Sequence, residues 1–171
     1  SKHDALLDSV YVAQLLRHEN VARTFGVNMN PEARAHNGAP LGVCILMDHF
    51  EHGSLRQLLD RATPRSLTWH SRLQILRGVA TGMHSLHGTS PIPIFHRNLK
   101  SANVLMEVIQ NGDGRVTKYV PKLSDIGFVG IHRGHNITRR NTAEGSPLCL
   151  VPWKAPETLY QKHAFTKSSD V

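Results

Sequence analysis

The chain has 171 residues, of which 40% are hydrophobic and 19% charged, a composition that fits one globular domain and excludes a disordered polymer. Its longest apolar run, residues 41–47, is much shorter than the roughly 20 residues of a membrane span, so no transmembrane helix is expected. The net charge is +7, but the densest basic stretch (131–140) has no aromatic residue for base stacking, so no nucleic-acid partner is expected. Only two cysteines are present, which argues against a disulfide-rich secreted fold and favours a cytoplasmic location.

Apolar spacing predicts the elements of the first half of the chain. Leu6, Val10, Ala13 and Leu16 recur every three to four residues and predict an amphipathic helix that ends near residues 17–20. A strand is expected over 21–28, a polar loop over 30–40, and a buried strand over the continuous apolar run 41–48. Residues 55–61 are expected to form a short helix with Ser54 as its N-cap.

The second half is predicted to hold the clearest helix and a hairpin. The helix begins after Thr68 and is closed by Gly88 and Pro91. Its predicted apolar stripe consists of Trp69, Leu73, Leu76, Ala80 and Met83. Strands are expected over 103–108 and 119–123, joined through residues 111–114, and 125–156 is predicted to be a long loop. This order of elements favours an α+β fold.

Three short motifs follow one another in this half. They are His96-Arg-Asn-Leu-Lys-Ser-Ala-Asn103, Asp125-Ile-Gly127 and Ala155-Pro-Glu157. In this order they resemble the catalytic loop of protein kinases, the metal-binding turn that opens their activation segment, and the motif that closes it. Residues 16–21 resemble the turn after the regulatory helix of that family, and Ser168-Ser-Asp-Val171 resembles the start of its large central helix.

The resemblance covers essentially the whole chain and is greatest to the tyrosine-kinase-like branch. It implies a two-lobe kinase-like fold, with residues 1–47 in the N-lobe, 48–52 as the hinge and 53–171 in the C-lobe. No Gly-rich loop and no strand lysine precede the first helix in this sequence, and nothing follows Val171. The expectation is therefore a partial domain, truncated in both lobes, that runs from the regulatory helix to the start of the central helix.

The resemblance also implies a binding site for ATP and Mg²⁺. Asn103 and Asp125 match the magnesium ligands, which are hard oxygen donors, and Lys100 matches the lysine that faces the transferred phosphate. The positions that match the nucleotide-lining residues are Met47 (the gatekeeper), Asp48, Phe50 and Leu105. The alternative for Asp125 and Gly127 is an ordinary turn pair.

Three positions depart from the family pattern. Asn98 stands where the family has its catalytic carboxylate, and an amide cannot take the proton of the acceptor hydroxyl, an assistance worth about 10²–10⁴ in rate. On an ungapped count, the regulatory-helix glutamate falls on Ser9, or on Asp8 if the count is off by one. The alternative for Asn98 is that it merely caps a turn. Ile126 replaces the usual aromatic residue but is apolar and is expected to pack inward.

Arg97 matches the arginine that receives a phosphate on the activation segment, where Thr138, Thr142 and Ser146 are candidates. The alternative is that these are three solvated hydroxyls.

Histidine pairs at 84/87 and 132/135 raise a zinc site as an alternative, but zinc normally takes four ligands, and the two cysteines lie far from both pairs in sequence.

The leading hypothesis is a catalytically impaired pseudokinase that binds ATP weakly or not at all and acts in signalling through protein partners. The alternative is an active ATP-dependent Ser/Thr or Tyr protein kinase represented by a partial sequence.

Overall fold

The elements of the chain come from a computed structural model that describes residues 2–30, 32–62, 67–89, 91, 93–126, 153–157 and 166–170, without the side chains of residues 2–6, 8 and 9. In chain order they are α1 (Lys2–Leu15), β1 (Thr24–Asn28), β2 (Cys44–Met47), α2 (Leu55–Arg61), α3 (Trp69–His87), the 3₁₀ turn η1 (Ser101–Asn103), β3 (Val104–Gln110), β4 (Val116–Leu123) and the 3₁₀ turn η4 (Ser168–Asp170). The predicted mixture of helices and strands in an α+β order is confirmed.

The described strands form two antiparallel pairs, β1 with β2 and β3 with β4. In the second pair Val104 faces Leu123, and the strands continue to the pairing of Gln110 with Val116. At the connecting turn, Asn111 Oδ1 accepts a hydrogen bond from the Arg115 backbone nitrogen at 2.8 Å. The predicted hairpin is confirmed, and both of its strands are longer than expected.

The strand predicted over 41–48 is shorter and less buried than its apolar sequence indicated. Within the described chain, β2 pairs only with β1. Ile45 packs against α1, whereas Leu46 is 64% exposed, and Leu41 and Val43 are also exposed. A continuous apolar run predicts a strand covered on both faces, and here only the α1 face is covered. The strand predicted over 21–28 likewise begins later, at Thr24.

Side-chain caps explain why two helices have the predicted bounds. At the start of α2, the Ser54 hydroxyl accepts from the Gln57 backbone nitrogen and the Gln57 side chain accepts from the Ser54 backbone nitrogen, which is a complete capping box. Thr68 caps α3 by accepting from the Ser71 backbone nitrogen at 3.2 Å. The Gly88 backbone nitrogen donates to the last turn of α3 at 2.9 Å.

Of the predicted apolar stripe of α3, only Met83 is buried. The residues that α3 buries are Ile75, Gly82, Met83 and Leu86. Trp69 and Leu76 are 71% and 61% exposed, and Leu73 and Ala80 are exposed as well. The helix has two apolar stripes, and β4 packs against the one that contains its glycines. The spacing of apolar residues predicts that a helix has an apolar stripe, but it does not predict which stripe packs against another element.

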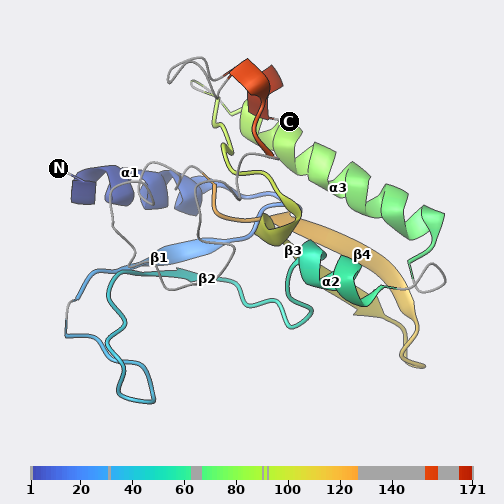
Figure 1. The fold of residues 1–171 in the computed structure, drawn as a ribbon, viewed down its shortest axis with the longest axis horizontal. Helices are drawn as coiled ribbons and strands as arrows, with labels where there is room; N and C mark the ends of the chain where they lie inside the picture. Colours follow the sequence, from blue (N-terminus) through green and yellow to red (C-terminus); the bar gives the residue numbers. More distant parts are fainter. Residues whose placement is uncertain are drawn as a thin grey trace.

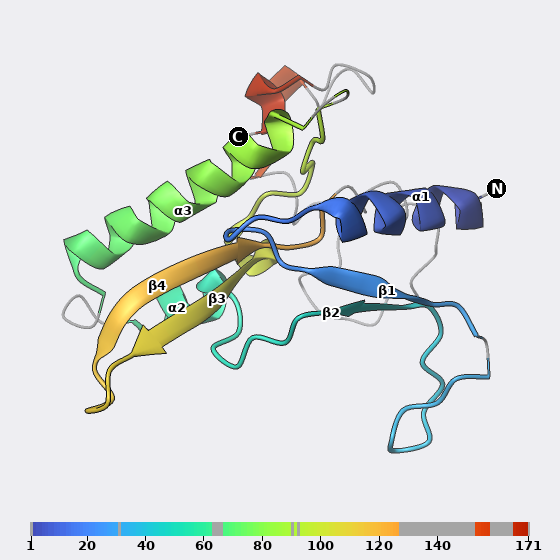
Figure 2. The ribbon, with the colours of Figure 1, turned by 180° about the vertical axis from the view of Figure 1, so that it is seen from behind.

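Figures 1 and 2 show the layers: α1 lies along β1, and α3 lies along β4. The main core lies between α3 and the β3–β4 pair, and its most deeply buried side chains are Leu67, Leu86, Met106 and Leu123. A smaller cluster joins Val10 and Ala13 of α1 to Val27 and Ile45. Among the described residues, no helix combines the length and the apolar character needed to cross a bilayer.

Candidate functional site

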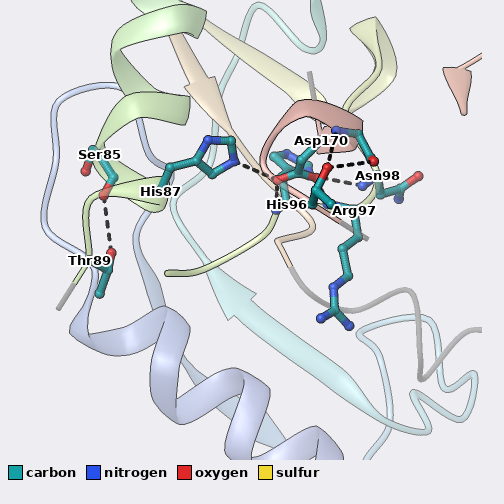
Figure 3. A network of polar contacts seen from close by, with 9 residues as sticks. Ser85, His87, Thr89, His96, Arg97, Asn98 and Asp170 are labelled. Carbon is teal, nitrogen blue, oxygen red and sulfur yellow. Dashed lines mark hydrogen bonds and ion pairs between the residues drawn. The ribbon is translucent and has the colours of Figure 1, made fainter. Parts of the chain in front are cut away.

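A buried carboxylate from the far end of the chain holds the segment that contains the catalytic-loop motif (Figure 3). Asp170, which is 4% exposed, accepts hydrogen bonds from the backbone nitrogens of His96 and Arg97 at 2.6 and 2.5 Å. The Nε2 atom of His87, in the last turn of α3, lies 3.0 Å from the same carboxylate. Three donors compensate the cost of removing this carboxylate from water. The position of residues 96 and 97 is therefore set by Asp170.

His96 is a neutral, buried part of this network. Burial lowers the pKa of its imidazole, and the charge of Asp170 opposes the shift. Its Nδ1 accepts a hydrogen bond from the Asn98 backbone nitrogen at 3.3 Å, which assigns the proton of the neutral ring to Nε2. Within the described part of the chain, Nε2 has no hydrogen-bond partner.

Short hydrogen bonds connect Asn98, Asn103 and Ser124, the residue before Asp125. The Asn103 side-chain nitrogen donates to the carbonyl oxygen of Asn98 at 2.8 Å. The backbone nitrogen and the hydroxyl of Ser124 both donate to the carbonyl oxygen of Asn103, at 2.9 and 3.0 Å. Because Ser124 directly precedes Asp125, the catalytic-loop motif and the Asp125 turn are neighbours in space, although 21 residues separate Asn103 from Ser124.

The residues assigned to magnesium suit a hard cation. The hydrogen bond from the Asn103 side chain uses its amide nitrogen and not its oxygen, which is the atom that a cation needs. Asp125 is half-buried and has a φ of 59°, a left-handed conformation that is unfavourable for residues other than glycine. An amide oxygen and a carboxylate on adjacent segments are donors that fit Mg²⁺. The described residues contain no group of three or more His, Cys, Asp or Glu side chains able to hold a metal.

Arg97 and Lys100 flank Asn98. Arg97 also has a left-handed φ of 63°, and its guanidinium carbon lies 6.0 Å from the centre of the Phe95 ring. Figure 3 shows its side chain extending away from Asp170. Lys100 is half-buried, and its carbonyl oxygen accepts from the Asn103 backbone nitrogen at 2.9 Å. The three candidate phosphorylation sites, Thr138, Thr142 and Ser146, lie outside the described residues, as does Gly127.

The predicted nucleotide-lining residues are half-buried on three segments: Met47 in β2, Asp48 and Phe50 in the connection that follows, and Leu105 in β3. Met47 and Asp125 line the same small pocket between α1, the β1–β2 pair and the end of β4. Asp48 is fixed to Arg23, whose backbone nitrogen donates to the Asp48 carboxylate at 3.2 Å. The prediction that Ile126 packs inward is confirmed, since it is 7% exposed and belongs to the main core.

The motif at 155–157 lies beside the segment that ends in Asp170. The Ser169 hydroxyl donates to Glu157 Oε1 at 2.5 Å, and this bond is the main cause of the lowered pKa of Glu157. The side chains of Ser9 and Asp8, the candidate positions for the regulatory-helix glutamate, lie outside the described residues.

Sequence reasoning missed two residues that organise this site. Asp170 was identified only as part of the start of a helix, although a buried carboxylate always needs donors. Ser124 carried no sequence signal, because its role depends on two hydrogen bonds to a carbonyl group that is distant in sequence.

Comparison with known proteins gives consistent matches. A family model described as protein tyrosine and serine/threonine kinase matches residues 1–171. Mitogen-activated protein kinase kinase kinase 10 of Mus musculus is 34% identical over 169 residues, which cover 96% of this chain and 16% of that protein. A mitogen-activated protein kinase kinase kinase of Drosophila melanogaster is 30% identical over 168 residues (98% of this chain, 12% of that protein). The probable serine/threonine-protein kinase pats1 of Dictyostelium discoideum is 30% identical over 161 residues (94% and 4%). The chain thus spans less than a fifth of the length of each of these relatives.

Proposed function

Because the chain belongs to the protein tyrosine and serine/threonine kinase family, we propose that it is a catalytically impaired kinase domain that binds ATP with Mg²⁺ and acts in signalling through protein partners. The kinase-like fold implied by the motifs is confirmed by the same match. One observation carries the impairment: Asn98 offers an amide at the position where the family uses a carboxylate as a base. In this proposal, residues 48–52 are the hinge between an N-lobe part (1–47) and a C-lobe part (53–171).

Nucleotide binding is proposed because the residues around Asn98 keep the donors that phosphate and magnesium need. Asn103 and Asp125 would hold the cation, and Lys100 would face the terminal phosphate. When bound, Mg²⁺ would neutralise phosphate charge. The hydrogen bonds from Ser124 to Asn103 support this assignment, because they keep the two cation ligands on adjacent segments.

A second candidate function, an active protein kinase, is favoured by the names of the relatives, which are kinases. Kinase catalysis is mainly positioning and electrostatic stabilisation, so a chain that lacks the base retains part of the rate. The two candidates therefore differ in phosphate transfer rather than in nucleotide binding. A cytoplasmic location is part of both proposals and is supported by the low cysteine content.

A combined binding and transfer experiment tests the proposal. The melting temperature is measured with ATP and Mg²⁺, where binding at ten times Kd adds about 1.4 kcal/mol and raises Tm by about 3–6 °C. Radiolabelled phosphate transfer to a generic substrate is then measured for the wild type, Asn98→Asp, Ser9→Glu and the double variant. We expect no transfer by the wild type and little by either single variant. The double variant is expected to transfer more where the protein supplies the strand lysine that the glutamate holds, because the two positions serve different steps.

The outcomes separate the two candidates. Robust transfer by the wild type overturns the impairment and establishes the active kinase. A folded protein whose Tm does not respond to millimolar ATP and Mg²⁺ contradicts nucleotide binding. Robust transfer by Asn98→Asp alone shows that Ser9 is not the glutamate position or that Asp8 does its work.

A further inference from the structure

The turn that follows α1 is bonded to the end of β4, far from it in sequence. The side-chain nitrogen of Asn20 donates to the carbonyl oxygen of Pro121 at 3.0 Å, although 101 residues separate them. The backbone oxygen of Asn20 accepts from the Leu123 nitrogen at 2.9 Å, and the Ala22 nitrogen donates to the Leu123 carbonyl oxygen at 2.9 Å. Asn20 is 7% exposed and Leu123 is fully buried. The turn therefore acts as an additional short strand along β4.

Two glycines of α3 make room for this contact. A Cβ atom at Gly82 would lie 2.9 Å from the Asn20 carbonyl oxygen and 2.9 Å from a methyl carbon of Leu123. A Cβ atom at Gly78 would lie 2.5 Å from Pro121 Cγ and 2.9 Å from the Asn20 side-chain nitrogen. All of these distances are shorter than a side chain accepts, so the backbone of α3 at the two glycines lies directly against Asn20 and against the Pro121 and Leu123 side chains of β4. The Asn20 amide is enclosed between the other two elements.

The end of β4 leads directly to the proposed cation ligand. Leu123 is followed by Ser124, which is bonded twice to Asn103, and then by Asp125 with its left-handed φ of 59°. A strained residue keeps its conformation only when its neighbours determine it. On its N-terminal side, Asp125 depends on two anchors: the bonds from Ser124 to Asn103, and the bonds from the 20–22 turn to Pro121 and Leu123.

We propose that Asn20 is a positioning residue for Asp125: by holding the end of β4, it places the Asp125 carboxylate where it meets the cation together with Asn103. Asn20 touches neither the nucleotide nor the metal, and its effect passes through Leu123 and Ser124. The cation part of this inference rests on the proposed function. The mechanical part, the holding of residues 123–125, does not.

The mechanical part is tested without nucleotide, by amide hydrogen exchange of the full chain. Asn20→Ala removes the donor to Pro121 and leaves the backbone of the turn in place. The matched control is Thr68→Ala, which removes the side-chain cap at the start of α3, about 20 Å along the helix from Gly82 at 1.5 Å per residue. We expect the amides of Leu123 and Ser124 to exchange at least tenfold faster in Asn20→Ala than in Thr68→Ala, after correction for global stability.

The cation part is tested by comparing ATP affinity with Mg²⁺ and in EDTA. We expect Asn20→Ala to reduce the gain in affinity from Mg²⁺ by about threefold to tenfold, while ATP affinity in EDTA stays at the wild-type value. A residue that serves folding alone would change both affinities together or change neither.

Each outcome decides one part. Equal exchange of Leu123 and Ser124 in the two variants overturns the inference, whatever the nucleotide results are. Faster exchange with no response of the wild type to Mg²⁺ and ATP supports the mechanical part and overturns the cation part together with the proposed function. Faster exchange with an unchanged Mg²⁺ gain overturns the role of Asn20 in cation binding while the proposed function stands. Should Asn20→Ala not fold, Asn20→Ser serves as the milder variant, with the same expected direction.

Discussion

In the proposed function Asn98 changes the chemistry of its loop, but its side chain is not needed for the shape of the loop. Its backbone nitrogen donates to His96 Nδ1 and its carbonyl oxygen accepts from the Asn103 side chain, so its fixed contacts are made by backbone atoms. A carboxylate at this position would leave both bonds in place. For this reason a substitution at residue 98 reports on proton transfer rather than on folding.

His96, two residues earlier, makes the stability of the protein depend on pH. Because burial lowers its pKa below the ordinary 6.5, the unfolded chain takes up a proton at a higher pH than the folded chain does. The contribution of His96 to the free energy of unfolding is therefore full above pH 6.5 and is lost as the pH falls toward the lowered pKa. We expect the wild type to lose stability between pH 7 and pH 5, and His96→Phe to lose less over the same range, as measured by urea unfolding.

The control for this prediction is His36→Gln, because His36 is exposed. Its slope of unfolding free energy against pH is expected to match that of the wild type. If His96→Phe has the same slope as the wild type, another group carries the pH dependence and the assignment to His96 is wrong.

At the scale of elements, α3 uses glycine where helix propensity favours alanine. Replacing Gly78 by alanine would stabilise an isolated helix by about 1 kcal/mol. Here the added methyl group would lie 2.5 Å from Pro121 of β4, inside the contact distance of two carbon atoms. We expect Gly78→Ala to lower the free energy of unfolding by about 1–3 kcal/mol, as over-packing does. The control Thr81→Ala, on the exposed side of α3, should change it by about 0.5 kcal/mol or less. A more stable Gly78→Ala would contradict the close approach of α3 and β4.

The sequence predictions are accurate where the interactions that decide a feature join residues close together in the sequence, and less accurate where they join distant residues. The bounds of α2 and the start of α3 were predicted well, because Ser54 and Thr68 cap residues only three positions away. The burial of β2 was predicted wrongly, and the face of α3 that is buried was not identified, because both depend on which neighbour covers an apolar surface. The glycines of α3 are an example. Their spacing is visible in the sequence, but the sequence does not show that β4 packs against them.

The same distinction applies to the candidate site. The motif residues Asn98, Asn103 and Asp125 were found from their order along the chain. Their mutual placement depends on Ser124, Asp170 and Asn20, whose contacts span from 21 to 101 residues. A single sequence contains no signal for contacts at such separations, since each partner is an ordinary polar residue when taken alone.

At the scale of the whole molecule, two buried polar residues join distant parts of the chain. Asn20 connects the turn after α1 to the end of β4, and Asp170 connects the last described segment to α3 and to residues 96–97. Both are nearly inaccessible to water, so each of their hydrogen bonds is costly to break. The candidate site lies where the segments held by these two residues meet, between Asn103 and Asp125.

Asp170 should therefore be a main determinant of global stability as well as of the loop that contains Asn98. Asp170→Ala leaves the His96 and Arg97 nitrogens and His87 Nε2 without their acceptor, and a buried donor without a partner costs about 1–3 kcal/mol. We expect a loss of at least about 3 kcal/mol in the free energy of unfolding by urea. Asp170→Asn should lose less, because its amide keeps one acceptor oxygen, whereas Asp113→Asn, at the exposed hairpin turn, should change stability by about 0.5 kcal/mol or less. Equal stability of the Asp170→Ala and Asp113→Asn variants would mean that the loop is held by contacts other than this carboxylate.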